Sequence, residues 1–190
     1  MIEKPNWLYK PVSVDNLEAI QAEFLPILYN VIPDFDNAFP TFKFVSRNEI
    51  EKSAPLYSKF IESFGILDKW ERSVIVTTNF DHKFPIHVDH LDWKARAYGL
   101  NIPLINCDDT YTVFYDAEIN MMPVNNKAHP ENFARIIKKN SIATEIGRFP
   151  SSQPAWVNNS IPHTPVSKHN KPRALISARF EPEVHYLFNK

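Results

Sequence analysis

Residues 84–93 read FPIHVDHLDW, so that two histidines and two aspartates fall within ten positions. In a β-strand, the side chains at positions i and i+2 point to the same face. His87 and Asp89 would therefore share one face of a strand, and Val88 would lie on the other. Pro85 and the β-branched neighbours disfavour a helix through this stretch. The sequence thus predicts a strand that presents an imidazole and a carboxylate side by side.

Short runs of β-branched and aromatic residues surround this stretch, and Pro, Asn, Asp and Gly separate them. The candidate strands occupy residues 73–80, 84–89, 98–107, 110–117, 143–149, 154–160, 161–167 and 173–180. Antiparallel strands without helical crossovers are typical of a jelly roll or a small barrel. We therefore expect a mostly β fold, α+β overall, with a jelly-roll core.

Residues 118–141 interrupt this pattern as an insertion. They look like a loop followed by a short helix that begins near Pro130. The basic run from Arg135 to Lys139 mixes with apolar residues at helical spacing, which is typical of the edge of an amphipathic helix. An insertion of this length is either a lid over a site or a disordered decoration, and the sequence leaves both open.

The first 70 residues carry helical signals. The stretch from Ser13 to Asn16 offers N-cap candidates ahead of apolar residues with a period close to 3.6. Pro26 falls inside this pattern and would end or kink the helix. Ser46 and Glu49 form a predicted capping box for a second helical segment. We expect a single domain, 1–190, in which helices from residues 1–70 pack on the outside of a core formed by residues 73–180.

The composition is that of a globular protein, with 44% hydrophobic and 23% charged residues and a net charge of −1. So small a charge gives no long-range attraction to nucleic acid or to an anionic membrane, and neither is an expected partner. Cys107 is the single cysteine, which excludes an internal disulfide and is typical of a reducing compartment. The sequence has no spanning apolar run and no secretory leader, so we expect a cytoplasmic protein.

A metal site built on the predicted barrel needs a third ligand from a distant strand. One imidazole and one carboxylate supply two ligands of a two-histidine, one-carboxylate triad, which holds Fe(II) and leaves open positions. His163, in the predicted strand 161–167, is the best candidate for the third ligand. Arg173 follows it by ten residues and opens the last predicted strand. A guanidinium directed into the barrel would need an anionic partner, and its planar fork suits a carboxylate.

His87-x-Asp89, the distal His163 and Arg173, set among eight predicted strands, resemble the Fe(II)/2-oxoglutarate-dependent dioxygenase superfamily. The resemblance covers roughly residues 73–180, looks closest to the aspartyl/asparaginyl and prolyl hydroxylase branch, and implies a double-stranded β-helix. It implies that His87, Asp89 and His163 bind Fe(II). Arg173 would bind the far carboxylate of 2-oxoglutarate, and O2 would be the second co-substrate. The products would be succinate, CO2 and a hydroxylated peptide side chain or small metabolite.

The resemblance also suggests further residues around the co-substrate and the substrate. Asn101 lies where the family's third strand often contributes a polar side chain to 2-oxoglutarate, and Tyr98 is a weaker candidate for that role. Trp93, Arg96 and Trp156 are candidates for gripping the substrate at the pocket mouth. A tryptophan in a jelly roll is, however, often plain core, and this alternative is favoured for Trp156.

Three positions complicate the resemblance. Many relatives carry a serine two residues after the arginine, where this chain has Leu175. Asp89 sets the chain apart from aspartyl-type β-hydroxylases, many of which lack the carboxylate ligand. Arg179 shares strand parity with Arg173 and is a rival carboxylate binder.

Two other functions fit a barrel of this kind. A non-redox jelly-roll binding protein would use the mouth of the barrel for a small carboxylate or a sugar. A cupin-like metal protein would carry more histidines and a glutamate in a glycine-rich setting, whereas this chain has only three glycines. The oxygenase is the function that we expect.

Overall fold

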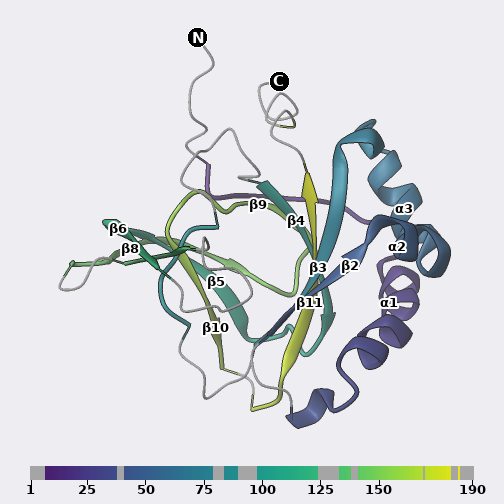
Figure 1. The fold of residues 1–190 in the computed structure, drawn as a ribbon, viewed down its shortest axis with the longest axis horizontal. Helices are drawn as coiled ribbons and strands as arrows, with labels where there is room; N and C mark the ends of the chain where they lie inside the picture. The colour runs from purple at the N-terminus through teal and green to yellow at the C-terminus, as the bar shows by residue number, and fades with distance from the viewer. Residues whose placement is uncertain are drawn as a thin grey trace.

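The computed structural model describes residues 7–37, 41–78, 84–89, 98–123, 133–137, 141–168, 170–180 and 184. A six-stranded antiparallel sheet runs in the order β1 (Tyr9–Pro11), β9 (Ala155–Asn158), β4 (Tyr98–Ile105), β11 (Arg173–Phe180), β3 (Trp70–Thr78) and β2 (Thr41–Ser46). A second antiparallel sheet contains β10 (His163–Ser167), β5 (Thr110–Asp116) and β8 (Thr144–Pro150). In Figure 1, the helices lie against one side of the larger sheet, and the second sheet lies on its other side. The predicted fold, a mostly β jelly roll with helices packed on the outside, is confirmed.

The central strand β11 divides its side chains between two environments, because successive side chains of a strand point to opposite faces. One set packs in the core shared with the helices: Ala174, Ile176, Ala178 and Phe180. The other set lines a pocket: Arg173, Leu175, Ser177 and Arg179. The larger sheet is therefore apolar toward the helices and partly polar toward the second sheet.

Three helices form the outer layer: α1 (Leu17–Val31), α2 (Arg47–Ser53) and α3 (Pro55–Glu62). α1 begins where the sequence predicts, although Asn16 at its N-cap is left-handed, with φ 59°, and caps no backbone N–H with its side chain. Pro26 does not end α1, since the helix buries Phe24 and Ile27 on either side of the proline and continues.

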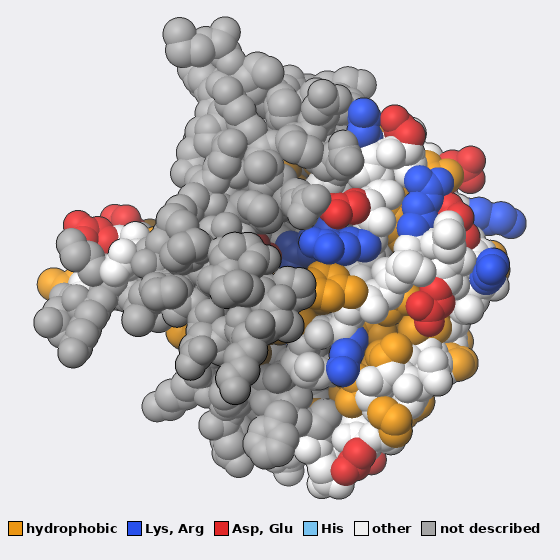
Figure 2. All heavy atoms as spheres, in the orientation of Figure 1, with side chains coloured by type: hydrophobic (Ala, Val, Ile, Leu, Met, Phe, Trp, Pro, Cys, Tyr) orange, Lys and Arg blue, Asp and Glu red, His pale blue; other side chains and the backbone are white. Residues whose placement is uncertain are grey.

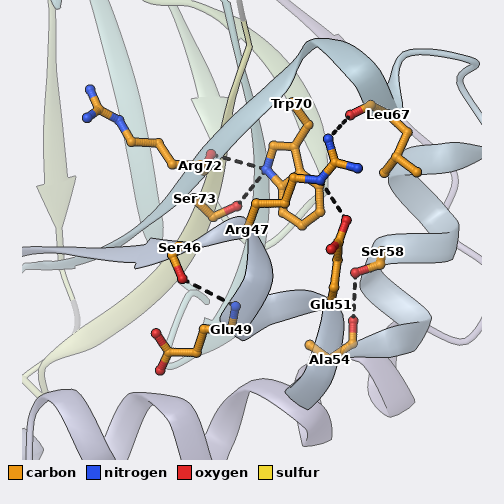
Figure 3. Close-up of polar contacts among 10 residues, drawn as sticks. All are labelled: Ser46, Arg47, Glu49, Glu51, Ala54, Ser58, Leu67, Trp70, Arg72 and Ser73. Carbon is orange, nitrogen blue, oxygen red and sulfur yellow. Dashed lines mark hydrogen bonds and ion pairs between the residues drawn. The ribbon is translucent and has the colours of Figure 1, made fainter.

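The serine half of the predicted capping box is present at the start of α2. The Ser46 hydroxyl accepts a hydrogen bond from the backbone N–H of Glu49 at 3.2 Å (Figure 3). The predicted second helical segment is divided at Ala54, and Pro55 opens α3, a position where its missing N–H costs nothing. Two short 3₁₀ turns, η1 (Phe35–Asn37) and η2 (Leu67–Lys69), complete this layer.

The expected helix near Pro130 is wrong. β6 (Ile119–Pro123) and β7 (Phe133–Ile137) pair antiparallel, with Ile119 opposite Ile137. A run of five residues is too short for helical spacing to decide, and the β-branched Ile136 and Ile137 favour a strand once a partner is available.

The larger sheet also gains two strands that the sequence did not predict. β1 and β2 form its two edges. Each is short, and each depends on pairing with a neighbour that is remote in sequence: β1 with β9, and β2 with β3. Strand formation here is decided by tertiary pairing rather than by local pattern.

The visible surface mixes both charges with apolar side chains, as Figure 2 shows for the side that carries the helices. In the part of the chain that the structure describes, no helix combines the length and the apolar character needed to cross a membrane.

Candidate functional site

His87 and His163 are brought together by the pairing of two backbone segments. The backbone N–H of His87 donates to the carbonyl of His163 at 3.0 Å, and that of His163 donates to the carbonyl of His87 at 2.8 Å. This reciprocal pair places the two imidazole rings 4.6 Å apart, measured between their centroids. Residues 84–89 form only this isolated bridge and not the strand that the sequence predicts. The bridge nevertheless aligns the segment with β10.

Asp89 completes the cluster from the same segment. Its backbone N–H donates to the carbonyl of Asn159 at 3.0 Å, which fixes the end of the segment. One carboxylate oxygen, Oδ1, lies 3.7 Å from His87 Nε2. Among the described residues, one possible ligand atom from each of His87, Asp89 and His163 lies within 4.8 Å of the other two. A single small cation can therefore contact all three after small side-chain rotations.

Backbone carbonyls fix the orientation of both imidazole rings. His87 Nδ1 lies 2.9 Å from the Pro85 carbonyl, and His163 Nδ1 lies 2.8 Å from the Ile161 carbonyl. Each ring therefore donates its Nδ1–H to a carbonyl two residues earlier, which leaves the Nε2 lone pair for a metal. Burial lowers the pKa of His163 to about 4, aided by the neighbouring His87, so that the ring is neutral at physiological pH. The donor set of two nitrogens and one oxygen suits Fe(II).

Arg179 holds the carboxylate of Asp89. Its Nη1 lies 2.9 Å from Asp89 Oδ2, the oxygen other than the one that lies near His87. Burial would raise the pKa of Asp89, but the charge of Arg179 and the nearby imidazoles outweigh burial and hold the pKa at about 2. Asp89 is therefore an anion throughout the physiological range.

A pocket opens from the three candidate ligands toward the inner face of the larger sheet. Its empty volume is about 490 Å³, a figure that includes space open to solvent. Its walls include apolar side chains from several strands and the two arginines of β11. The apolar part consists of Phe42, Val76, Phe84, Val157, Pro165 and Leu175.

Arg173 lines this pocket and is only 1% exposed. Its Nε donates to Thr78 Oγ1 at 2.5 Å, and its Nη1 donates to Thr110 Oγ1 at 3.4 Å. Burial lowers the pKa of the guanidinium from its ordinary value, although Cys107 opposes the shift. No carboxylate of the described residues forms an ion pair with Arg173. The inward direction that the sequence suggested thus leaves a buried cation whose charge is not balanced by a described carboxylate.

The remaining predicted residues separate into three groups. Asn101 lines the pocket and accepts a hydrogen bond from the Ser177 hydroxyl at 2.6 Å. Tyr98 lies on the opposite face of β4, where it stacks on Trp7 with ring centroids 5.2 Å apart, so it does not reach the pocket. Trp156 packs in the core on the helix side and therefore does not line the mouth. Trp93 and Arg96 lie outside the described residues.

Several pocket residues were not found by sequence reasoning. Asn159 lies four residues before His163 and lines the pocket, as do Thr112 and Phe42. Parity along the predicted strand 154–160 places Val157 and Asn159 on the same face, so Asn159 could have been found by the rule used for His87 and Asp89. Phe42 could not, because β2 was not predicted.

Solved structures provide the comparison with known proteins. A Pseudomonas putida prolyl-4-hydroxylase aligns with a TM-score of 0.52 and 8% identity, over 91% of this chain and 91% of that chain. A Trichoplax adhaerens prolyl hydroxylase, in complex with a hypoxia inducible factor peptide fragment, aligns with a TM-score of 0.52 and 10% identity, over 96% and 87%. The chain has the fold of the Fe(II)/2-oxoglutarate-dependent oxygenases.

A third oxygenase structure supports the same fold. SnoK, a non-heme alpha-ketoglutarate-dependent carbocyclase from nogalamycin biosynthesis, aligns with a TM-score of 0.50 and 12% identity, over 96% of this chain and 85% of that chain. No sequence-family model matches the chain, and no curated protein matches it significantly. At such low identity, the resemblance to these oxygenases is one of fold, and the chemistry has to be argued from the site itself.

Proposed function

We propose that this protein is an Fe(II)- and 2-oxoglutarate-dependent oxygenase that hydroxylates a peptide side chain or a small metabolite. The observation that supports this most strongly is the cluster of His87, Asp89 and His163 in one pocket with a buried Arg173. The first three supply the ligands, and the fourth supplies a cation for an acidic co-substrate. The fold supports the same class.

Each residue has a definite task in this proposal. His87 and His163 would hold Fe(II) through Nε2, because their Nδ1–H groups are held by backbone carbonyls. Asp89 would contribute Oδ1 while Arg179 holds Oδ2. When bound, iron would supply the oxidising chemistry by which O2 and 2-oxoglutarate give succinate, CO2 and a hydroxylated product.

Arg173 would bind and orient the far carboxylate of 2-oxoglutarate. The hydroxyls of Thr78 and Thr110 accept hydrogen bonds from the guanidinium, and these bonds fix its orientation before a ligand binds. A charge-assisted, two-pronged contact of this kind is strong in a buried site. The apolar walls at Val76 and Leu175 would keep water away from the chain of the co-substrate.

Anaerobic addition of Fe(II) and 2-oxoglutarate tests the proposal. The wild-type protein should develop the weak visible charge-transfer band of a chelated 2-oxo acid, and after admission of O2 it should form succinate. His163→Ala should show neither, while its far-ultraviolet circular dichroism stays that of the wild type. A wild-type protein that binds the metal but neither develops the band nor forms succinate would contradict the proposal and favour a non-redox binding protein.

A further inference from the structure

Two buried side-chain N–H groups, one in the pocket wall and one opposite the pocket residue Arg179, make no hydrogen bond. Asn159 is 3% exposed, and its Nδ2 is buried without a hydrogen-bond partner. Arg72 Nε is likewise buried without a hydrogen-bond partner, although Glu71 lies at 4.0 Å. A buried donor without an acceptor costs free energy, so two of them near one pocket indicate a ligand that brings oxygen atoms.

The charges at this end point to an anionic ligand. Arg72 and Arg179 are directly opposite each other in the antiparallel pairing of β3 and β11. Side chains paired in this way lie on the same face, and like charges directly opposite destabilise a sheet. Asp89 lies 2.9 Å from Arg179, and Glu71 pairs with Arg72 only at 4.0 Å, so a further anion would relieve the repulsion between the two arginines.

Asn159 and Arg179 come together with Ser177 over Gly99. A methyl carbon on Gly99 would lie 2.8 Å from Ser177 Oγ, 2.9 Å from Asn159 Nδ2 and 3.1 Å from Arg179 Nη1. These three polar atoms therefore pack closely over Gly99, and any larger residue at this position would displace them. Asn159 and Arg179 also line the pocket that contains the three candidate ligands.

Phe44 lies two residues along β2 from the pocket residue Phe42 and therefore on the same face of the sheet. It is 63% exposed, and the guanidinium carbon of Arg72 lies 4.5 Å from the centre of its ring. A partly exposed arginine beside an open aromatic ring can bind a carboxylate while the ring covers the apolar part of the same molecule.

We propose that Arg72, Asn159 and Arg179 form a second recognition site, which binds a carboxylate of the compound to be oxidised. This inference rests on the proposed function, in which Arg173 at the other end of the pocket holds 2-oxoglutarate. The substrate is thus an acidic small molecule or an acidic peptide. The reacting carboxylate of 2-oxoglutarate has the same chemistry and is the alternative source.

The test uses Mn(II)-loaded protein saturated with 2-oxoglutarate. Acetate and its uncharged counterpart acetamide serve as probes, and paramagnetic broadening of their methyl signals reports binding near the metal. Wild type should broaden acetate much more than acetamide. Arg72→Met and Asn159→Leu should each weaken acetate binding about 10-fold or more, as expected when a hydrogen bond to a charged group is lost.

Arg47 provides the matched control. It too lies over an aromatic ring, 5.8 Å from the centre of Trp70, but its donors are occupied by Glu51 and the Leu67 carbonyl (Figure 3). Arg47→Met should leave acetate binding unchanged. Asn158 is the control for Asn159, because its amide bonds both Trp7 and Ser160. Asn158→Leu should lower the melting temperature, whereas Asn159→Leu should not.

The affinity for 2-oxoglutarate distinguishes the two sources of the carboxylate. If the substrate supplies it, Arg72→Met and Asn159→Leu bind 2-oxoglutarate as wild type does. If 2-oxoglutarate supplies it, its affinity falls in both variants, and the proposal that the site binds substrate is overturned. Equal broadening by wild type and both variants, or equal binding of acetate and acetamide, would also overturn it.

Failure of the proposed function would be seen separately. If Mn(II) or 2-oxoglutarate does not bind, saturation-transfer NMR of acetate on the unloaded protein replaces the broadening measurement. Acetate binding that then still depends on Arg72 and Asn159 would support an anion site in a protein that is not an oxygenase. Binding that depends on neither residue would overturn the site as well.

Discussion

Arg173 and Arg179 lie on the same face of the same strand, yet their surroundings differ. Arg173 is fully buried against two threonine hydroxyls, and no described carboxylate pairs with it. Arg179 is 16% exposed in its side chain and pairs with Asp89 at 2.9 Å. The first arginine has its charge available for a ligand from solution. The second directs part of its charge to a residue of the metal site.

Position along β11 determines which groups surround each arginine. Arg173 begins the strand, where it meets the end of β3 and the start of β5. Arg179 lies near the other end, where the segment carrying Asp89 crosses. A strand with four alternate side chains facing the pocket can therefore place the proposed co-substrate contact and the partner of a candidate metal ligand on the same face.

The largest effect is expected from Arg173→Leu. Loss of a two-pronged, charge-assisted contact should weaken 2-oxoglutarate binding by roughly 100-fold. The melting temperature should stay equal or rise, because the substitution removes a buried charge that no described carboxylate balances. Calorimetric titration and thermal denaturation measure the two quantities. A variant that keeps its 2-oxoglutarate affinity would contradict the proposal that Arg173 binds the co-substrate.

Arg179→Met should act on the metal rather than on 2-oxoglutarate. Without Arg179, the Asp89 carboxylate loses the partner that orients Oδ2, and metal affinity should fall by about 10- to 100-fold. Unlike Arg173→Leu, this variant should be less stable than wild type, because Asp89 is left as a partly buried anion. Mn(II) titration followed by electron paramagnetic resonance measures the affinity. Unchanged affinity would show that the ion pair does not support the ligand.

Lysine replacements at positions 173 and 179 test whether each arginine acts through its charge or through its planar shape. Lysine keeps the charge but lacks the planar fork. Arg179→Lys should keep metal affinity within roughly threefold of wild type, since one charged contact to Asp89 is retained. Arg173→Lys should lose about 10-fold in 2-oxoglutarate affinity, because a single ammonium cannot contact the threonines and hold a carboxylate in the same geometry. Equal sensitivity at the two positions would argue against distinct tasks.

The smallest effect is expected from Ser177→Ala, which lies between the two arginines on the same face of β11. The variant loses the hydrogen bond from the Ser177 hydroxyl to Asn101, at 2.6 Å. The free energy of unfolding should fall by about 1 kcal/mol, as for a typical neutral hydrogen bond. Urea denaturation measures this change, and the affinities for metal and 2-oxoglutarate should each stay within about twofold of wild type. A larger change in either affinity would show that this hydrogen bond supports the site.

Much of the fold can be predicted from the sequence, because the alternation of buried and exposed side chains along a strand is a local property. The pattern of β11 is readable from its residues, and Arg173 and Arg179 fall on one face by counting. The capping box at Ser46 is equally local. β1, β2 and the β6–β7 pair are not readable in this way, since each depends on a partner strand remote in sequence or across an insertion.

Part of the candidate site can likewise be predicted from local sequence, and part of it depends on contacts between distant residues. His87, Asp89, His163 and Arg173 can be named from residue type and spacing, and the structure brings the first three together. The pairing of Arg179 with Asp89 joins residues 90 positions apart, and the sequence indicates no such contact. The reverse failure occurs at Tyr98, a candidate co-substrate contact by sequence that faces the helical core instead. Trp156 also packs in that core, which is the alternative that the sequence favoured for it.

A structure of the protein with Mn(II) and 2-oxoglutarate bound would test the proposed metal and co-substrate sites most directly. It should show one ion at about 2.0–2.3 Å from Nε2 of both histidines and from Asp89 Oδ1, with the far carboxylate of 2-oxoglutarate on Arg173. An ion bound elsewhere, or 2-oxoglutarate bound with its far carboxylate away from Arg173, would contradict the proposal.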